Sequence, residues 1–449
     1  MRNIFLLIIL LSTFSFAQET EAVQIIGDSL TGKTINGENI REVIGNVVIT
    51  QGDVVITCRK AIQYITKNEF ELIGNVVATQ DTLVIETEKA YYFGNTKIAQ
   101  SDTLINLREP SFDLKANRGK YSYNEDLAQF FGDVVLNDSA FQLTSQELYY
   151  FKAEERINAK TNVQVMDSTS IIFADSIRHF RNEKLSFAFG NVRVDNFENN
   201  VLIYGDSLMN NNEQKYSKVT GSPLFIQIDT ANTYRIDTLM ITGKILESYN
   251  DSTKRFIATD NVKIIRDDFS SVNDKSIFYN AEERIETHKL TDESARPIIW
   301  SGENQLVGDS VFIYLKEQNL DWIDVRGSSL IISKKENYDW RYDQMSGSQI
   351  KMFFNDSTIS KTEVFDNVLS IYYMFEDGEP SGLIKSSSEN AKILFEDGQV
   401  VDVRLYRSVV SEYHPENLVA DKEREFTLPQ FIVYENRPSK NELKKLIRK

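Results

Sequence analysis

Two stretches of the sequence are nearly the same. Residues 45–61 read GNVVITQGDVVITCRKA, and residues 74–90 read GNVVATQDTLVIETEKA. Asn46 and Asn75 stand 29 residues apart, and the same step separates the polar residues of three later segments of this type, at positions 133, 162 and 191. A strict period in this range is typical of repeat proteins, in which each repeat forms one turn of an elongated stack. The sequence therefore predicts a stack of repeated units.

Each repeat is predicted to contain two short β-strands. The first strand opens with the Gly-Asn pair and alternates at Val47 and Ile49, and the second alternates at Val54 and Ile56. Because successive side chains of a strand point to opposite faces, these positions share one side of a sheet. Stacked repeats of this kind predict an all-β, solenoid-like fold with two facing sheets and apolar inner walls.

A bend is predicted after the second strand. It is marked by a small residue, two polar residues and an apolar residue, as in Ala174-Asp175-Ser176-Ile177, and the aspartate returns as Asp206 and Asp309. A small residue permits a close approach of the backbone. A catalytic carboxylate pair need occur only once, whereas these aspartates recur from repeat to repeat, so we interpret them as caps of the bends.

The composition argues against several functions. The net charge is −16 and no continuous basic face is present to neutralise phosphates, so nucleic acid is not an expected partner. Cys58 is the single cysteine of the chain, which excludes an intrachain disulfide. His179, His288 and His414 are far apart in the sequence and are predicted to lie on the surface, so we expect neither a metal nor a cofactor.

The two ends of the chain differ from its middle. Residues 1–17 carry an N-terminal positive charge, an apolar run and a small residue at Ala17, which predicts a signal peptide and export to the periplasm, with outer-membrane association left open. The repeats are expected to form a first run over 18–230 and a second over 231–410, because their spacing loosens in between. Residues 411–449 are predicted to be a C-terminal extension that is partly disordered.

These residues resemble the OstA/LptA family of lipopolysaccharide transport proteins, in the larger form found in Bacteroidetes-like bacteria. The Gly-Asn-Val motif, the paired strands and the Ala-Asp-Ser-Ile bends carry the resemblance over roughly residues 22–410. The segment 426–431, FTLPQF, is similar to the tail of the larger homologues. The chain is longer than the small periplasmic members, and it has no room for the barrel of the outer-membrane member.

The resemblance implies a β-jelly roll, also called a β-taco, whose apolar groove shelters the acyl chains of lipid A while the sugars stay outside. It implies lipopolysaccharide as the ligand, with other proteins of the same pathway or a second copy as partners through end-to-end strand pairing. No enzymatic activity is implied. The inward apolar positions, which are the candidate groove residues, are Val47, Ile49, Val54, Ile56, Val76, Leu83, Ile85, Val134, Leu136, Phe141, Leu143, Val163, Val165, Val192 and Val194.

Other interpretations of the same pattern stay open. Each inward valine or isoleucine could simply fill a closed core, which is the more frequent role of such a residue. The chain could then be a structural or adhesive exported solenoid. A polysaccharide-acting enzyme on a β-helix is a third hypothesis, but it needs a local cluster of acidic or basic residues that breaks the repeat, and none stands out.

Overall fold

The computed structural model describes residues 22–447, except 230–236, 268, 318 and 356–357. The signal peptide predicted at residues 1–17 lies outside these residues. The described residues form two compact units: unit 1 comprises 22–139 and 147–153, and unit 2 comprises 140–146 and 154–447. The boundary predicted near residue 230 falls among residues that the structure does not describe, so the predicted domain limits stay predictions.

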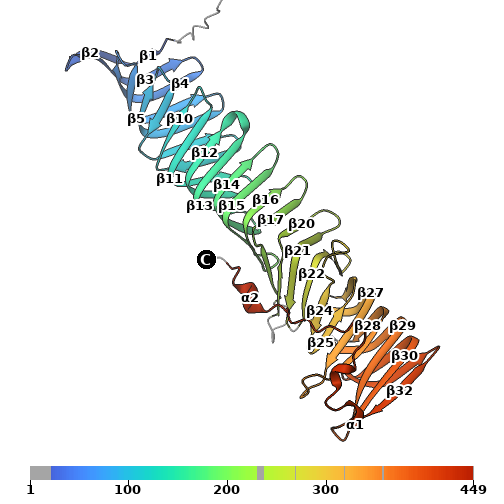
Figure 1. Ribbon diagram of the computed structural model, residues 1–449. Coiled ribbons are helices and arrows are strands. Elements are labelled where there is room, and N and C mark those ends of the chain that lie inside the picture. The colour runs from blue at the N-terminus through green and yellow to red at the C-terminus, as the bar shows by residue number, and fades with distance from the viewer. Residues whose placement is uncertain (1–21, 230–236, 268, 318, 356–357, 448–449) are drawn as a thin grey trace, which may run out of the picture. The chain divides into compact units, whose positions relative to one another are not determined.

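Unit 1 is a meander of antiparallel strands that lie side by side (Figure 1). Its strands are β1 (Gln24–Ile26), β2 (Ser29–Ile35), β3 (Glu38–Gln51), β4 (Val54–Tyr64), β5 (Glu69–Gln80), β6 (Leu83–Phe93), β7 (Ile98–Ser101), β8 (Ile105–Glu109), β9 (Phe112–Ala116), β10 (Arg118–Ser122) and β11 (Leu127–Asp138). Strand β12 (Gln142–Phe151) and the short helix η1 (Lys152–Glu154) are divided between the two units.

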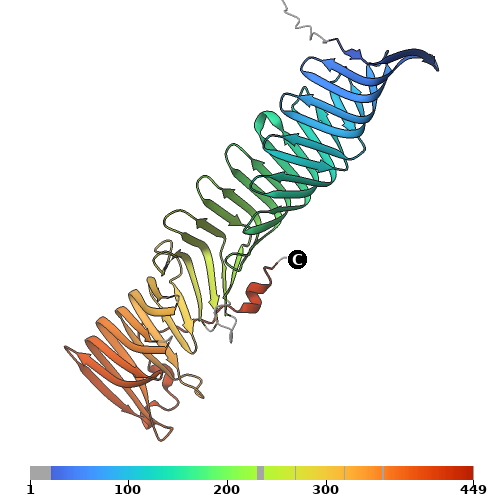
Figure 2. The same cartoon turned by 180° about the vertical axis from the view of Figure 1, so that it is seen from behind.

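Unit 2 continues with the same antiparallel pairing (Figure 2). Its strands are β13 (Arg156–Met166), β14 (Ser170–Phe180), β15 (Leu185–Asn196), β16 (Val201–Asn211), β17 (Tyr216–Thr220), β18 (Leu224–Asp229), β19 (Asp237–Thr242), β20 (Ile245–Tyr249), β21 (Arg255–Arg266), β22 (Phe269–Tyr279), β23 (Arg284–His288), β24 (Ile298–Ser301), β25 (Asn304–Val307), β26 (Ser310–Lys316), β27 (Asn319–Lys334), β28 (Tyr342–Asn355), β29 (Thr358–Glu376), β30 (Glu379–Glu396), β31 (Gln399–Tyr406) and β32 (Val410–Pro415). Three short helices follow: α1 (Glu416–Val419), η2 (Glu423–Glu425) and α2 (Lys440–Lys444).

A Gly-Asn pair bends strands β3, β5 and β15 in their middle. In β3 the pairing with β4 skips from Ile44 to Val47, so Gly45 and Asn46 form a bulge opposite a single residue of β4. Both have positive φ, 80° and 47°, which glycine and asparagine tolerate best. A bulge of this kind bends the strand, and the two halves of a bent strand can pair with different neighbours, as β6 does with β7 and β8. The prediction that a strand begins at the Gly-Asn pair is therefore wrong: the pair is the corner of a longer strand.

The two halves form two walls in each unit. Some strands, such as β5, carry the bulge, and the strands between them connect one bulged strand to the next. Wall A contains the halves of the bulged strands before the bulge, such as residues 69–73. Wall B contains the halves after it, such as residues 76–80. Each connecting strand returns from wall B to wall A through its own bend, as β6 does. The facing sheets predicted from the sequence are these two walls.

The recurring aspartates lock neighbouring corners together. The Asn191 side chain donates a hydrogen bond to Asp175 Oδ2 across 3.0 Å, and the Asn46 side chain donates to Asp28 over the same distance. A Cβ added at Gly190 would collide with Asp175 Oδ2, so this corner requires glycine both for its positive φ and for its contact. The interpretation of Asp175 as a cap of the bend agrees with these contacts.

The C-terminal segment, residues 416–447, packs on the outer face of wall B in unit 2. Leu428 lies in an apolar cluster with Leu330 and Ile332, and Leu443 of α2 lies in another with Leu224 and Ile226. Two buried glutamines hold the backbone of this segment. The side-chain amide of each donates one hydrogen bond to the segment and accepts one from it. Gln344 bonds Phe426 O and Leu428 N, and Gln305 bonds Ile432 O and Tyr434 N.

Candidate functional site

The inner surfaces of the two walls are the candidate site. Side chains on them fall into rows that follow the strand pairing, and two rows face each other across the trough of each unit. In unit 1 the inner row of wall B is Ile49, Ile56, Ala78, Ile85, Leu107, Leu114 and Leu136, and that of wall A is Gln63, Phe70, Tyr92, Ala99, Tyr121 and Ala128. In unit 2 the inner row of wall B runs Val165, Ile172, Val194, Ile203, Phe225, Ile241 and Ile264, and that of wall A runs Ile157, His179, Ser186, Asn210, Ser217, Ser248, Phe256 and Phe278.

The predicted groove residues all lie on the inner face, but most of them are inaccessible. The fully buried ones, at most 2% exposed, are Val47, Ile49, Val54, Ile56, Val76, Leu83, Val134, Leu136, Leu143, Val163 and Val192. The half-buried ones are Ile85, Phe141, Val165 and Val194. Contact of any of them with lipid stays a prediction, and the buried majority serve here as core.

Tyrosine bridges close the trough of unit 1. The Tyr92 hydroxyl, on wall A, donates to Gln51 Oε1 on wall B across 2.6 Å. One period later, the Tyr121 hydroxyl donates to Gln80 Oε1 across 3.0 Å. Burial raises the pKa of Tyr121 far above its usual value, so this hydroxyl stays protonated and keeps donating. A third wall-to-wall contact, edge to face, joins Phe112 to Tyr150 with ring centroids 5.2 Å apart.

The space behind the bridges is nearly filled. A cavity of about 30 Å³ remains between the walls of unit 1, lined mostly by apolar side chains that include Ile56, Val76 and Phe130. That space is large enough for only about two water molecules, so an acyl chain does not fit without movement of the walls. In this conformation the interior of unit 1 is a packed core.

Between β14 and β20, the trough of unit 2 differs from that of unit 1 in the burial and the polarity of its inner side chains. On wall B, the inner row remains apolar but is half-buried at Ile172, Val194 and Ile203. On wall A, the inner face of these strands carries two rows. The row nearer the corners is apolar and buried, at Ile177, Ala188, Leu208, Val219 and Leu246. The row further from the corners, which faces the half-buried row of wall B, is polar: its residues are His179, Ser186, Asn210, Ser217 and Ser248, none of which is fully buried. We call these two facing rows the open segment.

Aromatic contacts bracket the open segment. At one end Phe141 packs edge to face on His179, with 5.5 Å between ring centroids. At the other end Phe225 of wall B packs on Phe256 of wall A at 4.9 Å, and beyond it Ile241 and Ile264 are again buried. The polar row is internally hydrogen-bonded, because His179 Nδ1 shares a hydrogen bond of 2.9 Å with Ser186 and Ser217 donates to Asn210 Oδ1 at 2.7 Å.

Sequence reasoning missed both the tyrosine bridges and the polar row. The signal was nevertheless present, because the fourth residue after the bend of each connecting strand follows the 29-residue step as Tyr92, Tyr121, Tyr150 and then His179. The break in this tyrosine series marks where the wall-to-wall bridges end. The apolar alternation of the other wall, on which the prediction relied, does not change there.

The three histidines pack against aromatic rings. Each of these predicted surface residues is partly buried and partly exposed: His179 lies on Phe141, His288 on Phe312 and His414 on Phe426. Burial also lowers the pKa of His288. Cys58 is buried, and burial raises the pKa of its thiol, so it is a poor nucleophile.

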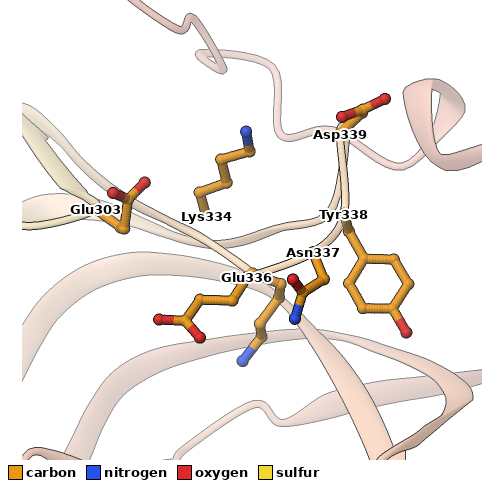
Figure 3. Close-up of a pocket in the computed structure, with 7 residues that line it drawn as sticks. Glu303, Lys334, Glu336, Asn337, Tyr338 and Asp339 are labelled. Atoms are coloured by element: carbon orange, nitrogen blue, oxygen red, sulfur yellow. The ribbon is translucent and has the colours of Figure 1, made fainter.

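A polar hollow lies elsewhere in unit 2, at the loop between β27 and β28. It has a volume of about 410 Å³ and is lined by Glu303 and residues 334–339. Figure 3 shows the carboxylates of Glu303, Glu336 and Asp339 pointing in separate directions. Within the described ranges, no group of three or more histidine, cysteine, aspartate or glutamate side chains could hold a metal ion.

Each unit also ends in an exposed edge strand. In unit 1, all residues of β2 are exposed, and Leu30 and Ile35 keep 56% and 51% of their surface accessible. In unit 2, β31 pairs only with β30, and Val401 and Val403 are 53% and 52% exposed. Exposed apolar edge strands are prone to pair with another chain. No helix of the described part of the chain is long and apolar enough to cross a membrane.

The fold and the trough define a class of protein: an all-β jelly roll of bent antiparallel strands around an apolar interior, as the sequence predicts. Residues 22–170 match the family model described as OstA-like protein, so the predicted resemblance is confirmed over that stretch. The solved structure of LptH, the LptA homologous periplasmic component of the lipopolysaccharide transport device of Pseudomonas aeruginosa, aligns with 12% identity over 42% of this chain and 92% of that chain, with a TM-score of 0.15. No curated protein matches the chain.

Proposed function

We propose that this chain is a non-enzymatic periplasmic protein of lipopolysaccharide transport and outer-membrane assembly, which shelters lipid A acyl chains between its two walls. The observation that supports this most is the apolar inner face of both walls in a chain whose residues 22–170 are OstA-like. An acyl chain of about twelve carbons costs roughly 10 kcal/mol to expose to water, at about 0.8 kcal/mol per methylene. An apolar trough removes that cost.

The exposed edges support partner binding by strand pairing. An added strand at β2 or β31 would satisfy unpaired backbone groups and cover Leu30 or Val401. The partners proposed are other proteins of the same pathway or a second copy of this chain. The export that this function requires comes from the predicted signal peptide, residues 1–17.

Co-purification from the native envelope tests the proposal. Full-length protein isolated from cells is extracted, and the extract is analysed for lipid A. We expect lipid A in the extract, and depletion of the protein in cells is expected to leave lipopolysaccharide in the inner membrane. Absence of lipid A together with normal lipopolysaccharide export would overturn the proposal.

A structural or adhesive solenoid is the second candidate, and the packed interior of unit 1 favours it. Under that hypothesis the walls never part, so no lipid should be recovered and depletion should weaken the cell surface without retaining lipopolysaccharide. The same two measurements therefore separate the candidates.

A further inference from the structure

The strands β14 to β20 of unit 2 differ from the strands of unit 1 in a way that suits one kind of ligand. Their inner row on wall B is apolar and only half-buried, at Ile172, Val194 and Ile203. The row that faces it carries hydroxyl, amide and imidazole groups instead of aromatic rings. An apolar inner face with a polar row along one side matches an amphipathic molecule rather than a purely apolar one.

The open segment also has smaller side chains where unit 1 has aromatic rings. In unit 1 the inner row of wall A includes Phe70, Tyr92 and Tyr121, which are at most 2% exposed and occupy the space between the walls. In unit 2, Ser186 and Ser217 stand at the position of Phe70, four residues before the corner glycine of their strands. A serine side chain leaves most of the volume of a phenyl ring unfilled.

The length of the open segment is set by the strand spacing. On wall A it extends over β14, β15, β16, β17 and β20, which are paired in that order. Five neighbouring strands at about 4.8 Å span roughly 20 Å. The bracketing contacts, Phe141 on His179 and Phe225 on Phe256, give the segment two ends.

We infer that the open segment is the place on this chain where the acyl part of an amphipathic lipid is held, with its methylenes on Val194 and Ile203 and its polar end toward Ser186, Asn210 and Ser217. This inference rests on the proposed function and assigns the site within it. The interior of unit 1 acts as a closed support rather than as a binding surface. The buried candidate residues of unit 1, such as Leu136, are then core side chains.

Photo-crosslinking in the full-length protein tests the assignment. Benzoylphenylalanine replaces Val194 or Ile203 in the open segment, and Leu107 or Leu136 in unit 1 as matched controls. The protein is irradiated in cells, and adducts are identified by immunoblot for lipopolysaccharide and by mass spectrometry for phospholipid. We expect adducts from Val194 and Ile203 at roughly ten times the yield from Leu107 and Leu136. A tenfold preference of the lipid for the open segment over unit 1 requires the burial of only about two more methylene groups there.

The outcomes separate this inference from the proposed function. Lipopolysaccharide adducts of equal yield in unit 1 and the open segment would overturn the inference and leave the function standing. Phospholipid adducts alone at Val194 and Ile203 would support an acyl site there and overturn the function. No lipid adduct at any of the four positions would overturn both.

Refilling the trough gives an independent measurement. The Ser217→Phe variant restores an aromatic side chain at the place where unit 1 has Phe70, and Lys218→Phe places the same ring on the outer face as a control. Binding of fluorescent lipid A to the purified protein is measured for each. We expect Ser217→Phe to weaken binding roughly 100-fold, the worth of about four methylenes, and Lys218→Phe to leave it unchanged. Equal binding by both folded variants would overturn the inference.

Discussion

The interior of unit 1 and the open segment of unit 2 use the same corners but different fillings. Both bend their strands at a positive-φ pair, Gly74-Asn75 in unit 1 and Gly190-Asn191 in unit 2. In unit 1 aromatic rings and tyrosine bridges join the walls, whereas in the open segment the equivalent row carries serines and an asparagine, and the apolar row of wall B is only half-buried. The difference between the two regions therefore lies largely in one row of side chains on one wall.

The largest expected contrast concerns truncation of inward side chains. Leu136 is fully buried, so Leu136→Ala should lower the free energy of unfolding by about 3 kcal/mol through lost transfer energy and the cavity left behind. Ile203 is half-buried, so Ile203→Ala should cost only about 1 kcal/mol. Urea denaturation followed by far-UV circular dichroism measures both variants. Equal losses would mean that the open segment is packed as tightly as unit 1, and the comparison would fail.

The corners should behave alike in both units. Gly190 has φ of 75° and faces Asp175. Gly190→Ala should therefore lower the free energy of unfolding by roughly 2 kcal/mol or more, because alanine is strained at positive φ and its Cβ collides with Asp175. Gly378, with φ of 84° and open space around it, is the matched control, and its alanine variant should cost about 1 kcal/mol. Thermal unfolding of the two variants supplies the difference. If Gly378→Ala were the more damaging change, the corner contact would not be what requires glycine at Gly190.

The tyrosine bridges should contribute measurably to unit 1. Tyr92→Phe keeps the ring and removes the hydrogen bond to Gln51, so the free energy of unfolding should fall by about 1 kcal/mol. Tyr64→Phe, at a half-exposed tyrosine, should change it by less than about 0.5 kcal/mol. Chemical denaturation distinguishes them. A neutral Tyr92→Phe would show that the walls of unit 1 stay closed through ring packing alone.

The smallest effect concerns helix α2 of the C-terminal segment, which packs through Leu443 against Leu224 and Ile226 on the outer face of wall B. The Lys263 ammonium bonds to Glu442 at 2.5 Å and lowers the pKa of that carboxyl below its usual 4.5. A lowered folded-state pKa means that the ion pair stabilises the folded protein fully above 4.5 and loses its contribution as the pH falls through the lowered value. Since the pair is largely exposed, it should contribute less than about 1 kcal/mol.

The Glu442→Gln variant tests that sign. Its melting temperature should lie slightly below that of the unchanged protein at about pH 7, and the gap should close as the pH falls through the lowered pKa of Glu442. A gap that widens on acidification would contradict the assignment of Lys263 as the partner of Glu442.

Much of the fold could be predicted because the repeat is strict. Alternation at Val47, Ile49 and their equivalents places the inner face, and the recurrence of Asp175 and its equivalents identifies the bends. The strand limits were predicted less well, because Gly45 and Asn46 look like the start of a strand when only the residues after them are considered. The position of the pair in mid-strand becomes visible only with the partner strand, which supplies hydrogen bonds on both sides of the bulge.

The sequence predicted that the candidate site lies on the inner face, but it did not predict which part of that face could bind a ligand. The fifteen candidate residues share the inner face, but alternation reports only which side of a sheet a residue occupies, not how far the opposite wall is or what fills the gap. The place where filling stops depends on residues such as Ser186 and Asn210, which look like ordinary polar positions in the sequence.

What the sequence by itself determined is the local pattern: strands of period two, bends marked by recurring aspartates and an apolar inner face, all readable from residues close along the chain. What only the tertiary structure decided is which parts of that inner face are closed and which outer face is covered. Tyr92 finds Gln51 forty-one residues away, and Gln344 holds Leu428 eighty-four residues away. Contacts at such separations depend on how the walls stack, and no local pattern encodes that.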